Sequence, residues 1–289
     1  MQRHLIVTAD DFGLHETVND AIEQASGAGI LTAASLMVSG SAAADAVRRA
    51  RRLPNLRVGL HLVLADGPAC LPHEQIPELT DAAGYMDSAM FLRGVRYFAR
   101  APVRRQLGNE IRAQFAAFAR TGLRLDHVNA HKHFHLHPTI LSTLLRVARE
   151  FGVRAVRVPD EPLWFAARSA GFDAALSTAL LRPWALLMKH RLRAAGIFHN
   201  DSLFGIAASG AMDEAALLAV LARLPCGVTE IYLHPALPGA NIAPGRSDYR
   251  HAEELQALLS PRVRAAFGAL NVRRGGYGDV LQNIGRSLA

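Results

Sequence analysis

The chain is poor in cysteine: in 289 residues only Cys70 and Cys226 occur. They stand too far apart to form a CxxC pair and give no disulfide framework, so they fit a reducing compartment. No apolar run approaches the ~18 residues of a membrane-spanning helix, and the first thirteen residues contain too short an apolar run for a signal peptide. We therefore expect a cytoplasmic protein, either free or resting on the inner face of a membrane.

Lysine is also scarce, and almost all of the basic residues are arginine. The formal net charge is +7 and the isoelectric point is about 10.1. The arginines are scattered or paired, as at Arg48-Arg49 and Arg104-Arg105, and no basic stripe interleaves with aromatic residues. The sequence therefore predicts no specific nucleic-acid binding, although a general attraction to anionic surfaces stays open.

Short apolar runs alternate with helical patterns along the chain, and half of the residues are hydrophobic. This alternation is typical of parallel strands joined by helical crossovers. Roughly seven or eight such units without a linker predict one α/β domain over residues 1–289, a TIM-barrel-like (β/α) barrel. The expected strands are Leu5–Ala9, Ala34–Val38, Leu56–Leu62, Leu125–Ala130, Ala155–Val158 and Thr229–Leu233. The expected helices are Glu16–Ala28, Ala42–Arg52, Val103–Arg120, Thr139–Phe151, Asp213–Leu224 and Tyr249–Leu259.

Two segments interrupt this alternation. The stretch Ala65–Arg93 is rich in proline and glycine and is expected to be a long loop. Residues at about 160–197 are apolar and helical, carry Trp164 and Trp184, and end in the basic run Lys189–Arg193. Because long insertions on a barrel usually serve a site or a partner, this helical insertion could shelter a lipid or rest on an anionic membrane. An ordinary helical cover packed on the barrel is the alternative.

Histidines crowd the segment Asp126–Pro138. Strict alternation in an extended chain would place His131, His133, His135 and His137 on one face. Imidazole is the commonest neutral metal ligand in proteins, so the cluster indicates a metal or catalytic site. The alternatives are a solvated loop or a histidine tract that binds metal without doing chemistry.

Acidic residues and histidines also stand at the ends of several predicted strands. Asp10 and Asp11 follow the first strand, His61 ends another, His131 follows a third, and His234 ends a fourth. Each has an ordinary alternative, such as a helix cap, a buried core histidine or a turn residue. Together they predict one site, because the carboxyl ends of barrel strands meet at one rim.

These residue types suggest a division of roles. Two imidazoles and one carboxylate, from His61, His131 and Asp11, suit a single divalent ion with open positions for water and substrate. The neighbouring Asp10 is better used as the general base that takes a proton from the attacking water. His234, on another strand, could protonate the leaving group as general acid.

The same residues carry a family resemblance that runs essentially from end to end. Four ordered segments resemble the motifs of the YdjC-like carbohydrate deacetylases: Thr8–Gly13, Gly59–Leu62, His131–His135 and Leu233–Ala236. Three further segments resemble the hopanoid-biosynthesis deacetylase subgroup, HpnK: Asp126–Pro138, Asn200–Gly205 and Arg274–Tyr277.

The resemblance implies an irregular (β/α) barrel, a divalent metal, and removal of the acetyl group from N-acetylglucosamine, in the subgroup on a hopanoid glycolipid. By motif position the ligands would be Asp11, His61 and His131, with Asp10 as the base. His133 and His135 would orient the ligands or line the sugar pocket. Asn129, which is also expected among the substrate-binding residues, stands where the family tends to have aspartate, so the contacts around the ligands should differ here.

Several alternatives stay open. Arg157, just past a predicted strand, could bind substrate or form an ordinary ion pair. The substrate could instead be a soluble chitooligosaccharide, or the chain could be a non-catalytic metal-binding barrel, against which the second carboxylate Asp10 argues. Ligand softness favours zinc, cobalt, manganese or iron, whereas the resemblance is often associated with magnesium. The oligomeric state, a dimer included, is not readable from the sequence.

Overall fold

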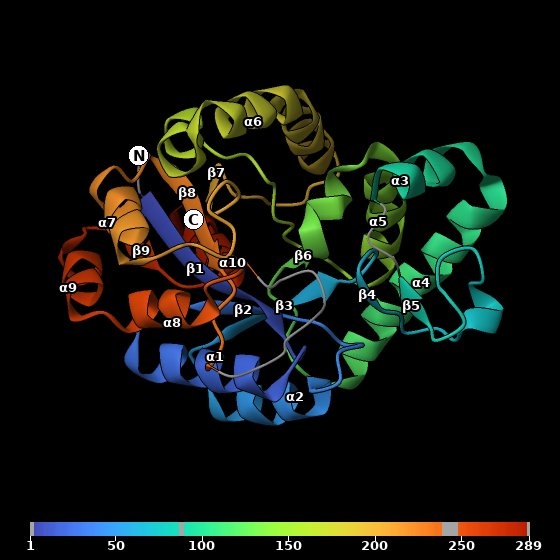
Figure 1. The fold of residues 1–289 in the computed structure, drawn as a ribbon, viewed down its shortest axis with the longest axis horizontal. Helices are drawn as coiled ribbons and strands as arrows, with labels where there is room; N and C mark the ends of the chain where they lie inside the picture. Colours follow the sequence, from blue (N-terminus) through green and yellow to red (C-terminus); the bar gives the residue numbers. More distant parts are fainter. Residues whose placement is uncertain (1–2, 87–89, 239–247, 288–289) are drawn as a thin grey trace.

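The computed structural model describes residues 3–86, 90–238 and 248–287, and a parallel sheet forms its centre (Figure 1). The sheet order is β6-β3-β2-β1-β8-β7, and β9 pairs with β1 as well. The sheet curls into a half-barrel surrounded by helices, which confirms the predicted α/β, barrel-like class. The strands are β1 Arg3–Phe12, β2 Ala33–Leu36, β3 Arg57–Leu62, β6 Val128–Ala130, β7 Ser202–Phe204, β8 Gly227–Leu233 and β9 Arg273–Arg274.

The barrel is irregular beyond β6. The predicted strand Ala155–Val158 makes isolated parallel bridges, from Val156 to Val128 and from Ala155 to Phe198. Farther along, the side chain of Asn200 takes the place of a strand partner. Its Oδ1 accepts a hydrogen bond from the Val158 amide at 2.7 Å, and its Nδ2 donates to the Val158 carbonyl at 2.8 Å. A side-chain amide therefore replaces part of the backbone ladder.

Most of the predicted helices are present within a few residues of their expected bounds. They are α1 Glu16–Ala28, α2 Ala43–Arg52, α4 Ala101–Arg120, α5 Pro138–Glu150, α7 Glu214–Ala222 and α8 His251–Leu259. The structure adds α3 Met90–Ala99, α9 Pro261–Ala269 and α10 Tyr277–Ser287. The helices surround the half-barrel: in Figure 1, α1 and α2 lie below it, α3 to α5 to the right, and α7 to α9 to the left.

The strands are apolar on both faces because both are covered. In β1, Leu5, Ile6, Val7 and Ala9 are fully buried, although alternate residues point to opposite sides of the strand. One side faces the interior of the half-barrel and the other faces helices. This two-sided burial explains why the strands read as continuous hydrophobic runs.

The two interrupting segments contain secondary structure of their own. The expected loop holds the short antiparallel ribbon of β4 Gly67–Pro68 and β5 Tyr85–Met86, with a 3-10 turn, η1, at His73–Gln75; residues 87–89 of that prediction lie outside the described part. The insertion forms α6 Leu163–Ala194, which is kinked at Ala170–Gly171, where Gly171 has φ 80°. No helix among the described residues is long and apolar enough to cross a membrane.

The histidine cluster is not an extended strand, so the prediction of one shared histidine face is wrong. Residues His131–Leu136 form a 3-10 segment, η2, directly after β6. Lys132 and His133 have φ of 55° and 54°, which turns the chain sharply just after His131. In this geometry alternate side chains leave in different directions, so His131 is separated from the histidines that follow it.

Candidate metal centre

A break in β1 brings two consecutive carboxylates to the same site. Adjacent side chains of a regular strand point to opposite faces, so Asp10 and Asp11 would normally diverge. The pairing of β1 with β2 shifts register between Ala9 and Phe12, and Asp11 has φ 65°. Aspartate tolerates this left-handed conformation better than most residues. The strand therefore includes both aspartates rather than ending before them, and the irregularity re-aims one of them.

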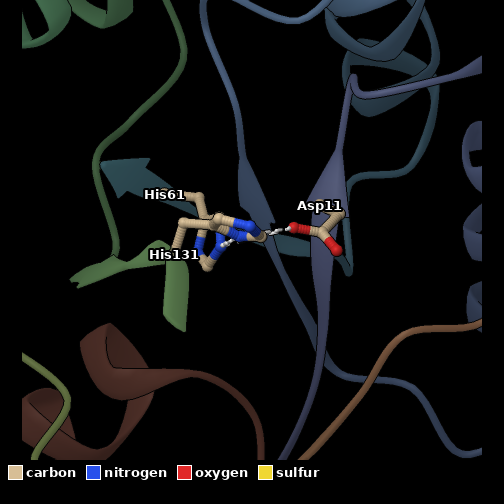
Figure 2. A group of neighbouring side chains, drawn as sticks. All are labelled: Asp11, His61 and His131. Atoms are coloured by element: carbon tan, nitrogen blue, oxygen red, sulfur yellow. Dashed lines mark hydrogen bonds and ion pairs between the residues drawn. The ribbon is translucent and has the colours of Figure 1, made fainter. Parts of the chain in front are cut away.

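Asp11, His61 and His131 converge from β1, β3 and the start of η2 (Figure 2). Asp11 Oδ1 lies 3.4 Å from His61 Nε2 and 3.3 Å from His131 Nδ1. The two imidazole nitrogens are 3.4 Å apart. All three side chains are almost fully buried. Among the described residues, these three side chains form a group that could hold a metal ion.

A hydrogen bond fixes which nitrogen of His61 faces the centre. His61 Nδ1 lies 2.7 Å from Asn129 Oδ1, which is an acceptor, so Nδ1 carries the proton. The lone pair of the neutral ring is then on Nε2, the atom that faces Asp11 and His131. Metal-binding histidines commonly show this arrangement, with the outer nitrogen bonded to an acceptor.

The donor set fits a divalent cation. Ligand bonds of about 2.1 Å in a tetrahedron give edges of about 3.4 Å, close to the three separations between Asp11, His61 and His131. A carboxylate oxygen and a ring lone pair that face each other away from water favour a cation between them. Three protein ligands leave positions for water and substrate, as in catalytic rather than structural sites.

Beside this centre, Arg157 is fully buried between two carboxylates. Its guanidinium donates to Asp10 at 2.5 and 3.0 Å and to Glu230 at 2.7 and 3.0 Å. Burial opposes ionisation of Asp10, but the charge and hydrogen bonds of Arg157 hold the pKa of this carboxyl well below its usual range. Asp10 is therefore ionised at every physiological pH. The ion pair is the alternative that the sequence had left open for Arg157.

Glu230 is a component that the sequence had not revealed. It lies on β8 and also accepts a hydrogen bond from Thr8 Oγ1 at 2.6 Å, while Tyr277 OH lies 2.5 Å from its Oε2. A carboxylate in the middle of an otherwise apolar strand was the available signal, because such a charge needs a buried partner.

His133 and His135 lie near the centre but outside its group of ligands. His135 is fully buried, and its Nε2–H donates to the Arg157 carbonyl at 2.8 Å. His133 packs against the edge of Tyr232, with ring centres 5.0 Å apart. Burial, reinforced by the Arg157 cation, lowers the pKa of His135 to about 4 and that of His133 well below its ordinary value. Both rings are therefore neutral near pH 7.

His234 follows β8 and is also buried. Its backbone N–H donates to Glu254 at 2.5 Å, and its ring lies between those of Tyr232 and Tyr249, with centres 5.4 and 5.0 Å away. It is close enough to Asp10 to lower the pKa of that carboxyl electrostatically. The predicted general acid therefore lies in the electrostatic neighbourhood of the predicted base.

Two hollows border opposite ends of the barrel. A small one of about 10 Å³ touches His131 and lies under the β4–β5 ribbon, beside Asp66 and Tyr85. Another, of about 310 Å³, lies at the amino ends of β3 and β6 and is bordered by Arg57 and Asp126. The larger hollow is at the wrong end of the strands for the chemistry, since the ligands come from the carboxyl ends.

Comparison with known proteins identifies the family. The model for the family described as YdjC-like protein matches residues 4–269, so the chain belongs to this family. A carbohydrate deacetylase of Geobacillus stearothermophilus is 30% identical over 276 residues, covering 94% of this chain and 96% of that protein. A carbohydrate deacetylase of Brevibacillus brevis is 41% identical over 155 residues, which is 54% of this chain and 59% of that protein.

Two further similarities cover almost the whole chain. A chitooligosaccharide deacetylase of Klebsiella pneumoniae (strain 342) is 28% identical over 281 residues, 97% of this chain and 100% of that protein. A solved structure from Enterococcus faecalis V583, provisionally named a cellobiose-phosphate cleavage protein, has a TM-score of 0.74 at 23% identity. It covers 97% of this chain and 99% of its own, which shows a shared fold.

The buried ion pairs predict that Arg157→Met destabilises the protein strongly. Removing the cation leaves Asp10 and Glu230 as uncompensated buried charges, which costs about 3–5 kcal/mol of unfolding free energy. Urea unfolding of the metal-free protein measures this loss. Arg112→Met is the control, because Arg112 pairs with Glu150 at the surface and should matter far less. Equal losses in the two variants would contradict the account.

Glu254 predicts a pH dependence of stability. Burial raises its pKa to about 7 in the folded protein, although the hydrogen bonds from the Met212 and His234 amides act to lower it. Above about pH 4.5 the unfolded state releases this proton, whereas the folded state keeps it on Glu254. The proton therefore adds to the free energy of unfolding at low pH, and this contribution is lost as the pH rises through 7. The shift corresponds to about 3 kcal/mol.

The test is urea unfolding at pH 5 and pH 8 with a chelator present. Wild type should lose more stability between these pH values than Glu254→Gln, which has no titrating carboxyl. The variant is expected to be weaker at pH 5, because one amide oxygen cannot replace the two carboxylate oxygens that accept from Met212 and His234. Parallel pH profiles for the two proteins would rule out a raised pKa of Glu254.

Proposed function

We propose that this chain is a metal-dependent carbohydrate deacetylase that hydrolyses the amide of an N-acetylated amino sugar. The observation that carries the proposal is the triangle of Asp11, His61 and His131 beside the ionised Asp10. The names of relatives that match over nearly the full length, carbohydrate deacetylase and chitooligosaccharide deacetylase, support the reaction class.

Asp11, His61 and His131 would hold one divalent ion, zinc or magnesium, with manganese or cobalt as alternatives. When bound, such an ion polarises a carbonyl oxygen and makes water more acidic. With two imidazole nitrogens among its three ligands, the site favours zinc, manganese or cobalt over magnesium. The buried position of the three ligands keeps competing water away, which strengthens electrostatic effects at the site.

In this proposal Asp10 is the general base. Its carboxylate accepts hydrogen bonds from Arg157 at both oxygens and from Asn129 Nδ2 at 3.1 Å. About one of its four acceptor positions is then left for the proton of the attacking water. Arg157 keeps the carboxylate ionised and fixes its plane, at the cost of lower basicity. The proton must therefore leave Asp10 again, to solvent or to a neighbouring group, before the next turnover.

His234 is proposed as the general acid that protonates this amine. It comes from β8, whereas Asp10 comes from β1, so the two groups can approach a substrate from different sides. Asn129 and Arg157 have their polar atoms bonded to protein, and we propose that they orient Asp10 and His61. The sugar-facing role is left to His133 and to the β4–β5 ribbon. Asp66, which directly precedes β4, pairs at 2.5 Å with Lys132, the residue after His131.

We further propose that the amino sugar is carried on a hopanoid lipid and that α6 rests on an anionic membrane. Its support is the outer face of α6, where Phe172 is 79% exposed, Leu180 68% and Trp184 47%. These residues recur at helical spacing, and the basic Arg191 and Arg193 follow them. The helix that carries this face also contacts η2, which begins with His131, so α6 packs next to the segment that supplies one of the proposed ligands.

A soluble chitooligosaccharide is the second candidate substrate, favoured by the name of the Klebsiella relative. The catalytic residues would be the same for both substrates. The outer face of α6 distinguishes them, because a soluble oligosaccharide gains nothing from exposed apolar side chains. Acetate release from N-acetylglucosaminyl bacteriohopanetetrol and from N,N′-diacetylchitobiose therefore separates the two proposals.

Asp10→Ala should lower acetate release by about 10²–10⁴-fold, the usual contribution of a general base. The variant should still bind one equivalent of zinc, because Asp11, His61 and His131 remain. Asp11→Ala is the matched neighbour and should lose both activity and zinc. Metal analysis after dialysis, combined with an acetate assay, measures the two effects. Undiminished turnover in Asp10→Ala would overturn the assignment of the base.

Substitution of Phe172, Leu180 and Trp184 by serine should weaken binding to phosphatidylglycerol-containing vesicles at least about tenfold, since burying each such side chain contributes about 1.5–3 kcal/mol. Flotation measures binding, and activity on N,N′-diacetylchitobiose should be unchanged. Phe98→Ser is the control, because Phe98 is 73% exposed on α3, away from this helix. Equal flotation of the triple variant and wild type would contradict the membrane proposal.

A further inference from the structure

We propose that a buried chain of hydrogen bonds through Asp126, His127, Ser35 and Asn129 fixes the tautomer of His61 that can bind a metal ion. These are positioning residues, none of which contacts the substrate in this account. The inference rests on the proposed metal centre, since it assigns His61 Nε2 as a ligand. It adds a function for a part of the histidine cluster that the proposed reaction does not use.

The chain begins at Asp126, which can only accept hydrogen bonds. Its oxygens accept from the backbone amides of Tyr277 at 3.0 Å and Gly278 at 2.8 Å, and from His127 Nδ1 at 2.9 Å. Burial opposes ionisation of Asp126, but the bonds from His127 and the two amides hold its pKa below the usual value. An ionised Asp126 requires that His127 Nδ1 carries a proton.

The direction of each following bond is then determined. In the tautomer of His127 that gives its Nδ1 proton to Asp126, the lone pair is on Nε2, which lies 3.1 Å from Ser35 Oγ. Ser35 must donate its hydroxyl proton to that nitrogen, because the nitrogen has none to give. Ser35 Oγ therefore accepts from Asn129 Nδ2 at 3.0 Å.

The hydrogen-bond partners of Asn129 fix the orientation of its side-chain amide. Its Nδ2 has two protons, one given to Ser35 and the other to Asp10 Oδ1 at 3.1 Å. Both partners are acceptors, so the amide oxygen must point the other way, toward His61 Nδ1 at 2.7 Å. A flipped amide would set its oxygen against the Asp10 carboxylate and its NH₂ group against the His61 N–H. The amide thus holds the His61 proton on Nδ1 and leaves Nε2 free to bind the ion.

The space around the chain is shaped for it. Ser35, His127 and Asn129 are all fully buried, so water cannot substitute for a missing partner. Gly59, two residues before His61 on β3, lies directly against the imidazole of His127. A β-carbon built at Gly59 would fall 2.5 Å from this ring. The glycine in the strand is explained by the close approach of His127 rather than by a turn.

Ser35→Ala tests the proposal, because it removes one hydroxyl and leaves all the proposed ligands intact. Zinc affinity, measured by competition with a chromophoric chelator, should fall roughly 10–100-fold, the range typical of lost outer contacts to metal-binding histidines. Nitrogen-15 NMR of the metal-free protein at pH 8 should show His61 as the Nδ1–H tautomer in wild type and a mixture in Ser35→Ala.

Thr229→Val is the matched control. Thr229 is buried on the neighbouring part of the sheet, and its Oγ1 has no hydrogen-bond partner among the described residues. It should retain wild-type affinity and the wild-type His61 tautomer. Gly59→Ala perturbs the chain from outside without removing a polar group, so it should resemble Ser35→Ala. Gly27→Ala, which has nothing within 4 Å of the added carbon, is its control.

The outcomes separate the two levels of the account. If Ser35→Ala keeps both the tautomer and the zinc affinity of Thr229→Val, the positioning chain is wrong even though the metal centre stands. If wild type binds no divalent ion but shows the Nδ1–H tautomer that Ser35→Ala loses, the chain exists and the proposed function fails. Loss of both zinc affinity and the His61 tautomer in Ser35→Ala and Gly59→Ala, with both retained in Thr229→Val and Gly27→Ala, supports the proposal.

Discussion

The arrangement of the site depends on one buried cation, Arg157. It comes from a segment that makes only isolated bridges, and it binds Asp10 and Glu230, which lie on the paired strands β1 and β8. Burying three charged groups is expensive, and apolar residues of similar volume would often be at least as stable. We infer that the cluster is retained for what it does to Asp10, which it keeps ionised and correctly aimed beside the candidate metal centre.

Much of this centre could be predicted from the sequence, because strand ends in a barrel meet at one rim. Asp11, His61 and His131 were expected together for that reason, and the structure does bring them together. The left-handed conformation of Asp11 and the 3-10 turn after His131 could not be predicted, because alternation of residue types suggests a regular strand. The Arg157–Glu230 pair joins residues 73 positions apart, and no local pattern specifies such a partner.

The segments that resemble the hopanoid-associated subgroup meet in the interior of the protein. Asp126 accepts from the Tyr277 amide, and Tyr277 OH lies 3.0 Å from Asn200 Oδ1 and 2.5 Å from Glu230. These segments therefore support the residues around the site instead of forming a surface for a lipid. In the proposed function, recognition of a lipid is assigned to α6, whose exposed apolar face lies outside this network.

The central claim is that one divalent ion is held by Asp11, His61 and His131. Anomalous diffraction from crystals grown with zinc tests it most directly. The account predicts one strong peak about 2.0–2.2 Å from Asp11 Oδ1, His61 Nε2 and His131 Nδ1. A peak held instead by His133 and His135, or by His61 through Nδ1, would contradict it.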